Sequence, residues 1–357
     1  MIPRTMKAVL LKGHGGPEQL DYRDDVPVPT PAAGEVLIRI GAAAVNNTDI
    51  NTRVGWYSRS VTTATDAAAA QTASAATDGG WAGNPFVFPR IQGTDACGRI
   101  VAVGAGVTEA RIGERVLVDP VLRPADGTLA NVGYVGLERD GSFAEFITVP
   151  AGNASRIESA LTDVELASFP CAYGTAENLL TRADVVPGES VLVTGASGGV
   201  GSAVVQLARL RGARVIAVTT RDKGGGVLAL GAQQVIERGA DPLHALGRES
   251  IDVVVDVVGG GAFASLLDVL KRGGRYAVAG AIAGPIVPLD LRTLYLKDLQ
   301  LLGCTVTTPA VFARLVDLIQ GGALQPVIRA VYPLADIALA QSDFLGKAQT
   351  GKIVLVP

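Results

Sequence analysis

The chain of 357 residues has few of the features that mark metal-rich, secreted or nucleic-acid-binding proteins. Its three cysteines, Cys97, Cys171 and Cys304, lie far apart without Cys-x-x-Cys spacing, which is typical of reduced thiols in a reducing compartment. No apolar run approaches the length of a bilayer span, and the first residues lack the apolar core of a signal peptide. The net charge of −3 supplies no basic field. We therefore expect a cytoplasmic protein whose partners include neither nucleic acid nor a membrane.

The composition is that of a globular protein, with 48% hydrophobic and 18% charged residues, and the length suits two domains. Before about residue 155, short apolar or alternating runs are separated by proline and glycine, which predicts a β-rich domain. The clearest strand candidates are residues 6–11, 35–42, 98–103, 115–118 and 144–149.

From about residue 160 the pattern changes to alternating helices and strands. The run at 251–258 is apolar apart from Asp252 and Asp256, as expected for a parallel strand that is buried on both faces. This alternation predicts an α/β fold with a Rossmann-type, doubly wound parallel sheet. The predicted helices are residues 161–168, 174–183 and 262–270, and the predicted strands begin at 190, 251 and 273.

The end of the chain offers a helix at 311–320 and a strand at 352–356, which is too little for a third domain. We expect this tail to pack back on the first domain. The predicted division is therefore 1–157 for the β-rich domain, 158–305 for the cofactor-binding domain and 306–357 for the returning segment.

The most informative stretch is Val-Leu-Val-Thr-Gly-Ala-Ser-Gly-Gly-Val-Gly at 191–201. An apolar run of β-formers breaks into Gly195, Gly198 and Gly201, and an apolar-periodic helix pattern follows. Strand, tight turn and helix are the context that a dinucleotide-binding loop requires. The glycines let the backbone approach a pyrophosphate, and the helix N-terminus presents unpaired N–H groups to the anion.

The second strand of this unit, 212–219, ends where NAD-binding folds usually place an acidic residue for the ribose 2′-hydroxyl. This chain has Thr219, Thr220, Arg221 and Lys223 there, with Asp222 between the two cations. Hydroxyls and cations favour a 2′-phosphate, so we expect NADP(H) as the cofactor. The alternative is that Arg221 and Lys223 decorate an exposed helix start.

Residues 58–80 have almost no large apolar side chains, so this segment cannot bury enough surface to offset its ordering entropy as an isolated piece. Its alanines are compatible with a short surface helix. Two interpretations stay open at this point: a surface insertion, and a flap over the site.

Together these features resemble the medium-chain dehydrogenase/reductase superfamily, most closely its zinc-independent quinone oxidoreductase and enoyl reductase branches. The resemblance implies a GroES-like catalytic domain formed by the N-terminal part and the tail, beside the Rossmann domain. It spans nearly the whole chain and rests on the motifs GEVLIR at 34–39, GTDACG at 93–98, GERV at 113–116, GSFAE at 141–145, DVVGG at 256–260 and GKIV at 351–354.

The zinc alcohol dehydrogenases of this superfamily are the first alternative. The resemblance places Asn46, Thr94-Asp95 and Cys171 where those enzymes have Cys, His-Glu and Cys, so one thiol remains of the ligand set. Zinc prefers about four strong N, S or O ligands. The second, structural zinc of those enzymes uses four clustered cysteines, and residues 98–170 contain none. We therefore expect no metal, and we expect His14 and His244 to be surface residues.

Without a metal, the expected reaction is reduction of a quinone or of a double bond conjugated to a carbonyl. Hydride adds to the electrophilic carbon, the charge delocalises onto oxygen and one proton completes the reaction. The segment from Asn46 to Tyr57 is similar to the mitochondrial enoyl thioester reductases, in which a tyrosine at this spacing is the proposed proton donor. Tyr57 is thus the candidate acid; the alternative is that it only packs beside Trp56.

The resemblance also implies roles for other residues. Asn46 and Thr48 line the substrate side of the nicotinamide, whereas Asp49 ties its loop together through backbone hydrogen bonds. Thr175 contacts the nicotinamide end or caps a helix. Relatives pair as homodimers through the strand near 301–306. The expected cofactor-binding set is completed by Gly195, Ser197, Gly198, Gly199, Val200, Gly201, Val258, Gly280 and Ala281.

Two other functions are compatible with the same residues. One is a zinc-free alcohol or ketone dehydrogenase on this scaffold, and the other is a non-catalytic NADPH-binding protein with a regulatory or structural role.

Overall fold

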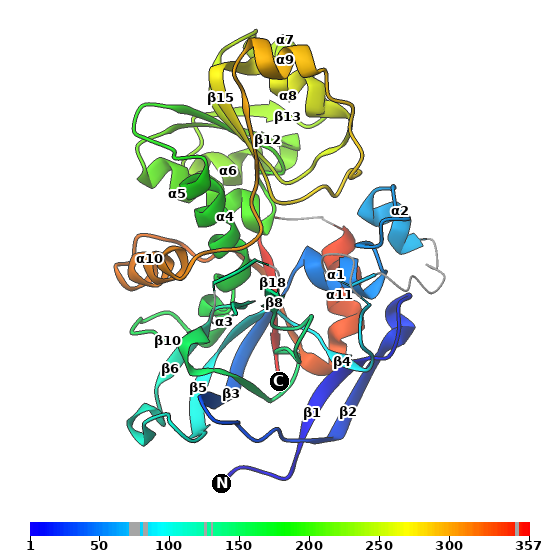
Figure 1. The fold of residues 1–357 in the computed structure, drawn as a ribbon, viewed down its shortest axis with the longest axis vertical. Helices are drawn as coiled ribbons and strands as arrows, with labels where there is room; N and C mark the ends of the chain where they lie inside the picture. The colour runs from blue at the N-terminus through cyan, green and yellow to red at the C-terminus, as the bar shows by residue number, and fades with distance from the viewer. Residues whose placement is uncertain (71–78, 81–84, 125–126, 130, 347–349) are drawn as a thin grey trace.

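The computed structural model describes residues 1–357 except 71–78, 81–84, 125–126, 130 and 347–349. A parallel sheet flanked by helices occupies one half, and a largely antiparallel sheet occupies the other (Figure 1). This arrangement confirms the α/β fold class expected from the sequence. Within the described part of the chain, no helix combines the length and the apolar character needed to cross a bilayer.

The sheet of the first half has the order β10-β6-β5-β3-β18-β17, and β9 also pairs with β3. β18 lies between β3 and β17, antiparallel to the first and parallel to the second, so the tail returns to the first half as expected. The bounds are β3 Glu35–Val45, β5 Asp95–Val103, β6 Arg115–Val118, β9 Phe146–Pro150, β10 Ala154–Arg156, β17 Ile328–Pro333 and β18 Lys352–Val356.

Smaller elements complete this half. A three-stranded sheet has the order β2-β1-β4, and β7 pairs with β8. Helix α1 follows β3 directly, and α11 packs beside α1 and β18 (Figure 1). The bounds are β1 Thr5–Leu11, β2 Leu20–Pro27, β4 Arg90–Ile91, β7 Val121–Leu122, β8 Gly133–Tyr134, α1 Asn47–Arg53, α2 Thr65–Ala70 and α11 Ile337–Gly346.

The second half is a six-stranded parallel sheet in the order β13-β12-β11-β14-β15-β16. Its strands are β11 Ser190–Val193, β12 Arg214–Thr219, β13 Gln234–Glu237, β14 Ile251–Asp256, β15 Leu270–Val278 and β16 Gln300–Gly303. The helices are α3 Asp163–Leu166, α4 Pro170–Arg182, α5 Gly199–Leu210, α6 Gly224–Leu230, α7 Pro242–Leu246, α8 Phe263–Val269, α9 Leu291–Leu296 and α10 Pro309–Gln320.

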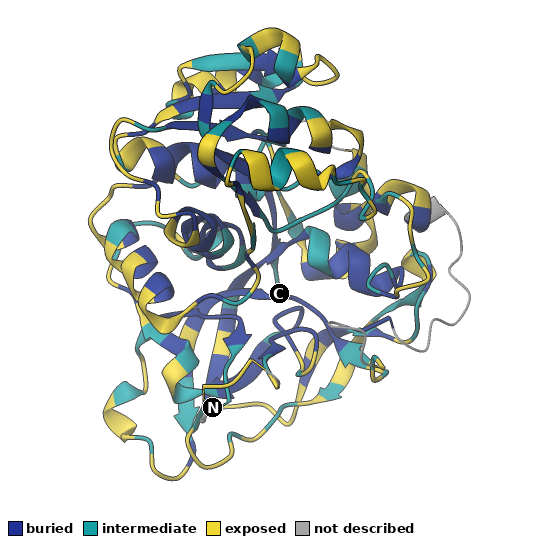
Figure 2. Ribbon diagram, turned by 45° about the horizontal axis from the view of Figure 1, so that its top comes forward, coloured by how far each residue is buried: buried dark blue, intermediate teal, exposed yellow. Residues whose placement is uncertain are grey.

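Alternate residues of each central strand belong to different cores, which explains the continuous apolar runs in the sequence. Val191 and Val253 pack with α4, α5 and α10 on one face. Leu192 and Val254 pack with α7, α8 and α9 on the other. Figure 2 shows these strands buried while the helices keep exposed outer faces.

Most predicted elements are present within a few residues of their expected ends. The sequence analysis missed the strands β2, β13 and β17, the short helices α1, α6, α7 and α9, and the longer helix α11. It also expected one helix over 161–168, where the chain forms the short α3 and then starts α4 at Pro170. Within the insertion at 58–80, a helix does form, α2, while residues 71–78 lie outside the described part.

Candidate active site

A cavity of about 1240 Å³ lies between the two halves, at the carboxyl ends of the parallel strands. Its wall brings together the expected catalytic residues and the expected cofactor-binding residues, with the exception of Arg221. Of the expected residues, those that line it are Asn46, Thr48, Tyr57, Thr175, Gly195, Ser197, Gly198, Gly199, Val200, Gly201, Thr219, Thr220, Lys223, Val258, Gly280 and Ala281.

The loop between β11 and α5 has the shape of a dinucleotide cradle. Gly195 has a φ of +58°, which L side chains rarely adopt. A Cβ on Gly201 would lie 2.2 Å from the carbonyl oxygen of Gly195, so only hydrogen fits there. Helix α5 begins at Gly199 and points its first, unpaired N–H groups toward the cavity. The residues present thus fit the pyrophosphate of a dinucleotide.

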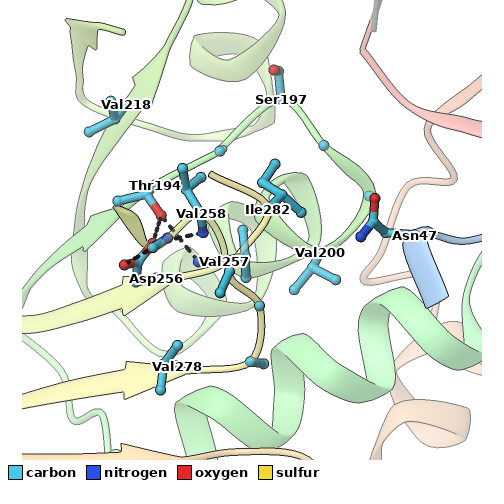
Figure 3. A pocket seen from close by; sticks show the side chains of 18 of the residues that line it. Asn47, Thr194, Ser197, Val200, Val218, Asp256, Val257, Val258, Val278 and Ile282 are labelled. Atoms are coloured by element: carbon cyan, nitrogen blue, oxygen red, sulfur yellow. Dashed lines mark hydrogen bonds between the residues drawn. The ribbon is translucent and has the colours of Figure 1, made fainter. Parts of the chain in front are cut away.

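Asp256, at the end of β14, organises the neighbouring loop of the cavity. Its buried carboxylate accepts hydrogen bonds from the Thr194 hydroxyl at 2.5 Å and from the backbone N–H of Val258 at 2.8 Å (Figure 3). The backbone N–H of Gly259 and the hydroxyl of Tyr276 also donate to it. The sequence analysis had used Asp256 only as part of a motif. An acid directly after the apolar run Val253–Val255 is the signal that could have identified this role.

The positive charge at the expected adenosine end of the cavity comes from one residue that the sequence analysis named and one that it did not. Lys223 lines the cavity, as does Arg238, which the sequence analysis missed. The side chain of Arg221 is 87% exposed and pairs with Glu237 at 3.3 Å, away from the cavity wall. β12 pairs with β13, and their last paired residues are Thr219 and Glu237. Arg238 therefore comes directly after a strand that ends beside Thr219, at the carboxyl edge of the sheet where the cavity lies.

Behind Asn46 and Cys171, which line the opposite wall, lies a buried ion pair; one of its partners, Asp95, is a residue that the resemblance matches to the metal site of the zinc dehydrogenases. The Nζ atom of Lys352 is 2.9 Å from Oδ2 of Asp95, and the two side chains are 4% and 0% exposed. Lys352 also donates to the Asn46 side-chain oxygen and to the Val45 carbonyl at 3.1 Å. The Asn46 amide in turn donates to Asp95 at 2.8 Å and to the Thr94 hydroxyl at 3.0 Å.

This donor set does not fit a metal ion. The ammonium of Lys352 already occupies Asp95, and the Asn46 amide is hydrogen-bonded at both of its ends. Burial, with the nearby charge of Asp95, raises the pKa of the Cys171 thiol to about 12, whereas a metal needs the thiolate. Among the residues that the structure describes, no three His, Cys, Asp or Glu side chains gather around a common point. These side chains are therefore committed to one another rather than to a metal ion.

His14 is not a surface residue, contrary to our expectation. Its Nδ1 lies 2.8 Å from the Thr52 carbonyl, and its ring packs against Phe86 and Phe88. The imidazole is half-buried because it fills the space between α1 and these aromatic rings.

Tyr57 follows α1 and lines the cavity together with Thr48 and Asn51. Burial raises the pKa of the phenol, while hydrogen bonds with the side chains of Thr48 and Asn51 lower it and offset part of that shift. The Trp56 ring stands edge-on to the Tyr57 ring at a centroid distance of 5.7 Å. The phenol is thus a protonated acid at neutral pH, with two polar partners beside its oxygen.

Asp49 ties the start of α1 together, as expected. Its Oδ2 accepts the backbone N–H of Asn46 at 2.7 Å, and its Oδ1 has no hydrogen-bond partner in the described structure. Burial raises the pKa of this carboxyl to about 7, although the Asn46 N–H and the Lys352 charge act in the opposite direction.

Comparisons with known proteins agree with this architecture. Residues 32–159 match the alcohol dehydrogenase GroES-like domain family, and residues 199–321 match the zinc-binding dehydrogenase family. The chain is 31% identical to acryloyl-coenzyme A reductase of Metallosphaera sedula, over 98% of this chain and 99% of that protein. It is 28% identical to human quinone oxidoreductase, over 99% and 98% respectively.

Among solved structures, the chain is similar to a putative alcohol dehydrogenase from Sinorhizobium meliloti 1021. The two share 50% identity with a TM-score of 0.91, and the match covers 100% of this chain and 98% of the other.

Proposed function

Because the chain belongs to the medium-chain dehydrogenase/reductase superfamily of oxidoreductases, we propose that it reduces quinones or α,β-unsaturated carbonyl compounds with NADPH. The proposal rests on one observation: a protonated phenol, Tyr57, and a dinucleotide cradle share a cavity whose Asn46 is held from behind by the buried Lys352–Asp95 pair. The relatives named acryloyl-coenzyme A reductase and quinone oxidoreductase support it.

The cradle residues from Gly195 to Gly201 would hold the pyrophosphate, and Thr175, Val258, Gly280 and Ala281 would border the nicotinamide half. At the other end, Thr219, Thr220, Lys223 and Arg238 offer hydroxyls and positive charge to a 2′-phosphate. When bound, NADPH supplies the hydride of the reduction.

The residues of this chain supply the proton and the hydrogen bonds that stabilise the group that donates it. Hydride addition to a conjugated carbonyl or quinone leaves negative charge on the substrate, and Tyr57 donates the proton that completes the reduction. The resulting phenolate keeps Thr48 and Asn51 as hydrogen-bonding partners. Asn46 and Cys171 form the floor, where the Lys352 ammonium holds the Asn46 side chain in place.

Such substrates need little polarisation of their oxygen, because conjugation already spreads the charge that develops. A simple ketone or alcohol requires stronger polarisation, which a metal usually provides. A second candidate function is nonetheless favoured by the 50% identical structure, whose name is putative alcohol dehydrogenase.

A spectrophotometric screen of NADPH oxidation with quinones, enones, enoyl thioesters and simple ketones tests the proposal. We expect turnover with one of the first three classes and little with ketones. Turnover confined to ketones supports the dehydrogenase function, and tight NADPH binding without turnover supports a non-catalytic role. With the best substrate, Tyr57→Phe should lower kcat by about 10²-fold or more while the KM for NADPH is unchanged.

We also propose a homodimer that forms through β16. This strand is one of the two edges of the parallel sheet, and Leu301 on it is exposed. Tyr295 and Leu296 on the adjoining α9 are exposed as well. Light scattering coupled to gel filtration should give twice the monomer mass, and Leu301→Lys should shift the protein to monomer.

A further inference from the structure

Thr65, the first residue of α2, joins the insertion to both halves of the site. Its side chain is fully buried, although most residues around it are exposed. Its hydroxyl donates to Oδ1 of Asn51 at 3.1 Å, and its backbone N–H donates to the Ile282 carbonyl at 3.0 Å. Asn51 and Ile282 both line the cavity, from the catalytic and the cofactor-binding halves respectively.

The hydrogen bonds around Asn51 determine which end of its amide faces Tyr57. The Oδ1 atom accepts from Thr65 and from the Asn47 amide, the latter at 3.2 Å. With the oxygen held by two donors, the NH₂ group of Asn51 is left to face the phenol oxygen. A donor at this place favours the phenolate that remains once Tyr57 has given up its proton.

A second contact links the same insertion to this region. The indole N–H of Trp56 donates to the Thr63 carbonyl at 3.0 Å, and the Trp56 ring packs edge-on against Tyr57. The segment just before α2 therefore holds the Trp56 ring against Tyr57, while Thr65 holds the Asn51 amide next to the Tyr57 phenol oxygen.

We propose that Thr65 is a positioning residue for proton donation: its hydroxyl fixes the Asn51 amide as a donor to Tyr57, and its backbone N–H ties this arrangement to the cofactor-side loop at Ile282. The inference rests on the proposed role of Tyr57. It also assigns the part of the insertion from Thr63 to Thr65 a function in the site.

The test compares Thr65→Val, which removes the hydroxyl and keeps the shape, with Thr65→Ser, which keeps the hydroxyl. Steady-state rates are measured with NADPH and either methyl vinyl ketone or crotonyl-coenzyme A, whichever the parent reduces faster. Thr65→Val should lower kcat three- to tenfold, about the value of one hydrogen bond, and leave the KM for NADPH unchanged. Its solvent deuterium isotope effect on kcat should rise, because proton donation becomes slower.

Controls separate this role from a structural one. Thr65→Ser should retain the parent kcat and isotope effect, and Thr62→Val, the same change at an exposed neighbour, should alter neither. Asn51→Asp places an acceptor where the phenol needs a donor, so its kcat should fall further than that of Thr65→Val. This second variant keeps the proposal testable if Thr65→Val folds poorly.

The outcomes distinguish the two proposals. If Tyr57→Phe loses activity while Thr65→Val and Asn51→Asp match the parent in kcat and isotope effect, Thr65 has no positioning role and the proposed function stands. If Tyr57→Phe is as active as the parent, or no substrate is turned over, both the acid and its positioning are wrong.

Discussion

The Lys352 side chain connects the central sheet of the catalytic half to the cofactor cradle, through Gly199. Its ammonium pairs with Asp95 at 2.9 Å. Its alkyl chain packs against Gly199, so closely that a Cβ added to Gly199 would lie 3.0 Å from the Lys352 Cδ atom. A single buried side chain thus supports both the floor of the pocket and the loop above it.

Replacing Lys352 with Met should destabilise the protein by about 3–5 kcal/mol, because the Asp95 carboxylate is left buried without its partner. Urea unfolding of the cofactor-free protein measures the free energy. The double variant Lys352→Met/Asp95→Asn removes the orphaned charge and should recover part of the loss. Equal stability of Lys352→Met and the parent would mean that the pair contributes nothing.

Gly201→Ala should abolish dinucleotide binding, since its methyl group would lie 2.2 Å from the backbone oxygen of Gly195 and force the cradle apart. The matched control is Gly225→Ala, in the helix α6, where a methyl group meets open space. We expect that control to bind NADPH normally and to be stabilised by up to about 1 kcal/mol. Calorimetric titration of both variants gives the affinities; unaltered binding by Gly201→Ala would contradict the assigned cradle.

Arg238→Ala and Lys223→Ala should each weaken NADPH binding about tenfold and leave NADH binding nearly unchanged, because a charged hydrogen bond to the 2′-phosphate is lost. Arg221→Ala should have a smaller effect, since that side chain is exposed and pairs with Glu237. Fluorescence titration with both nucleotides measures the two affinities. Equal losses for NADPH and NADH, or tighter NADH binding by the parent, would overturn the NADP assignment.

The Asp49 carboxyl should make stability fall as the pH rises. Burial raises its pKa to about 7, well above the value of about 4 in an unfolded chain, so the folded state binds its proton more tightly. The contribution of this carboxyl to the free energy of unfolding is then fully present below pH 4. It is lost between about pH 4 and 7, by up to about 1.4 kcal/mol per pH unit.

The comparison that isolates this group is with Asp49→Asn, which cannot titrate. Unfolding free energies of the two proteins, measured from pH 4 to 8, should diverge in favour of the variant as the pH rises to 7 and then run parallel. Parallel curves over the whole range would show that the carboxyl titrates normally.

Local patterns predicted most of the fold, and long-range contacts account for what they missed. The apolar runs of β11 and β14 and the glycines at 195–201 carry their own signal, because burial on both faces and a tight turn demand these residue types. In α11, by contrast, the buried face includes Gln341, which accepts a hydrogen bond from the buried Arg53 at 2.8 Å. A polar residue inside the core removes the apolar stripe on which sequence reasoning depends.

In the site, too, local sequence patterns located some residues, and long-range contacts place the others. The cradle could be located from consecutive residues, whereas Arg238 joins it only through the register of β12 and β13. The ion pair of Lys352 with Asp95 joins residues on strands that no local pattern connects. The place of Thr65 depends on a segment whose composition predicts no packing at all, yet one of its hydroxyls is fully buried.

The position of β18 also bears on how the protein is made. Until residues 352–356 leave the ribosome, one side of β3 near Val45 stays an open edge, ready to pair with any extended segment. The cofactor-binding half can complete its own sheet earlier, because all six strands precede this point. Nascent chains stalled or truncated before Lys352 should therefore contain a finished nucleotide-binding unit beside an aggregation-prone partner, and chaperones would have to protect that edge during synthesis.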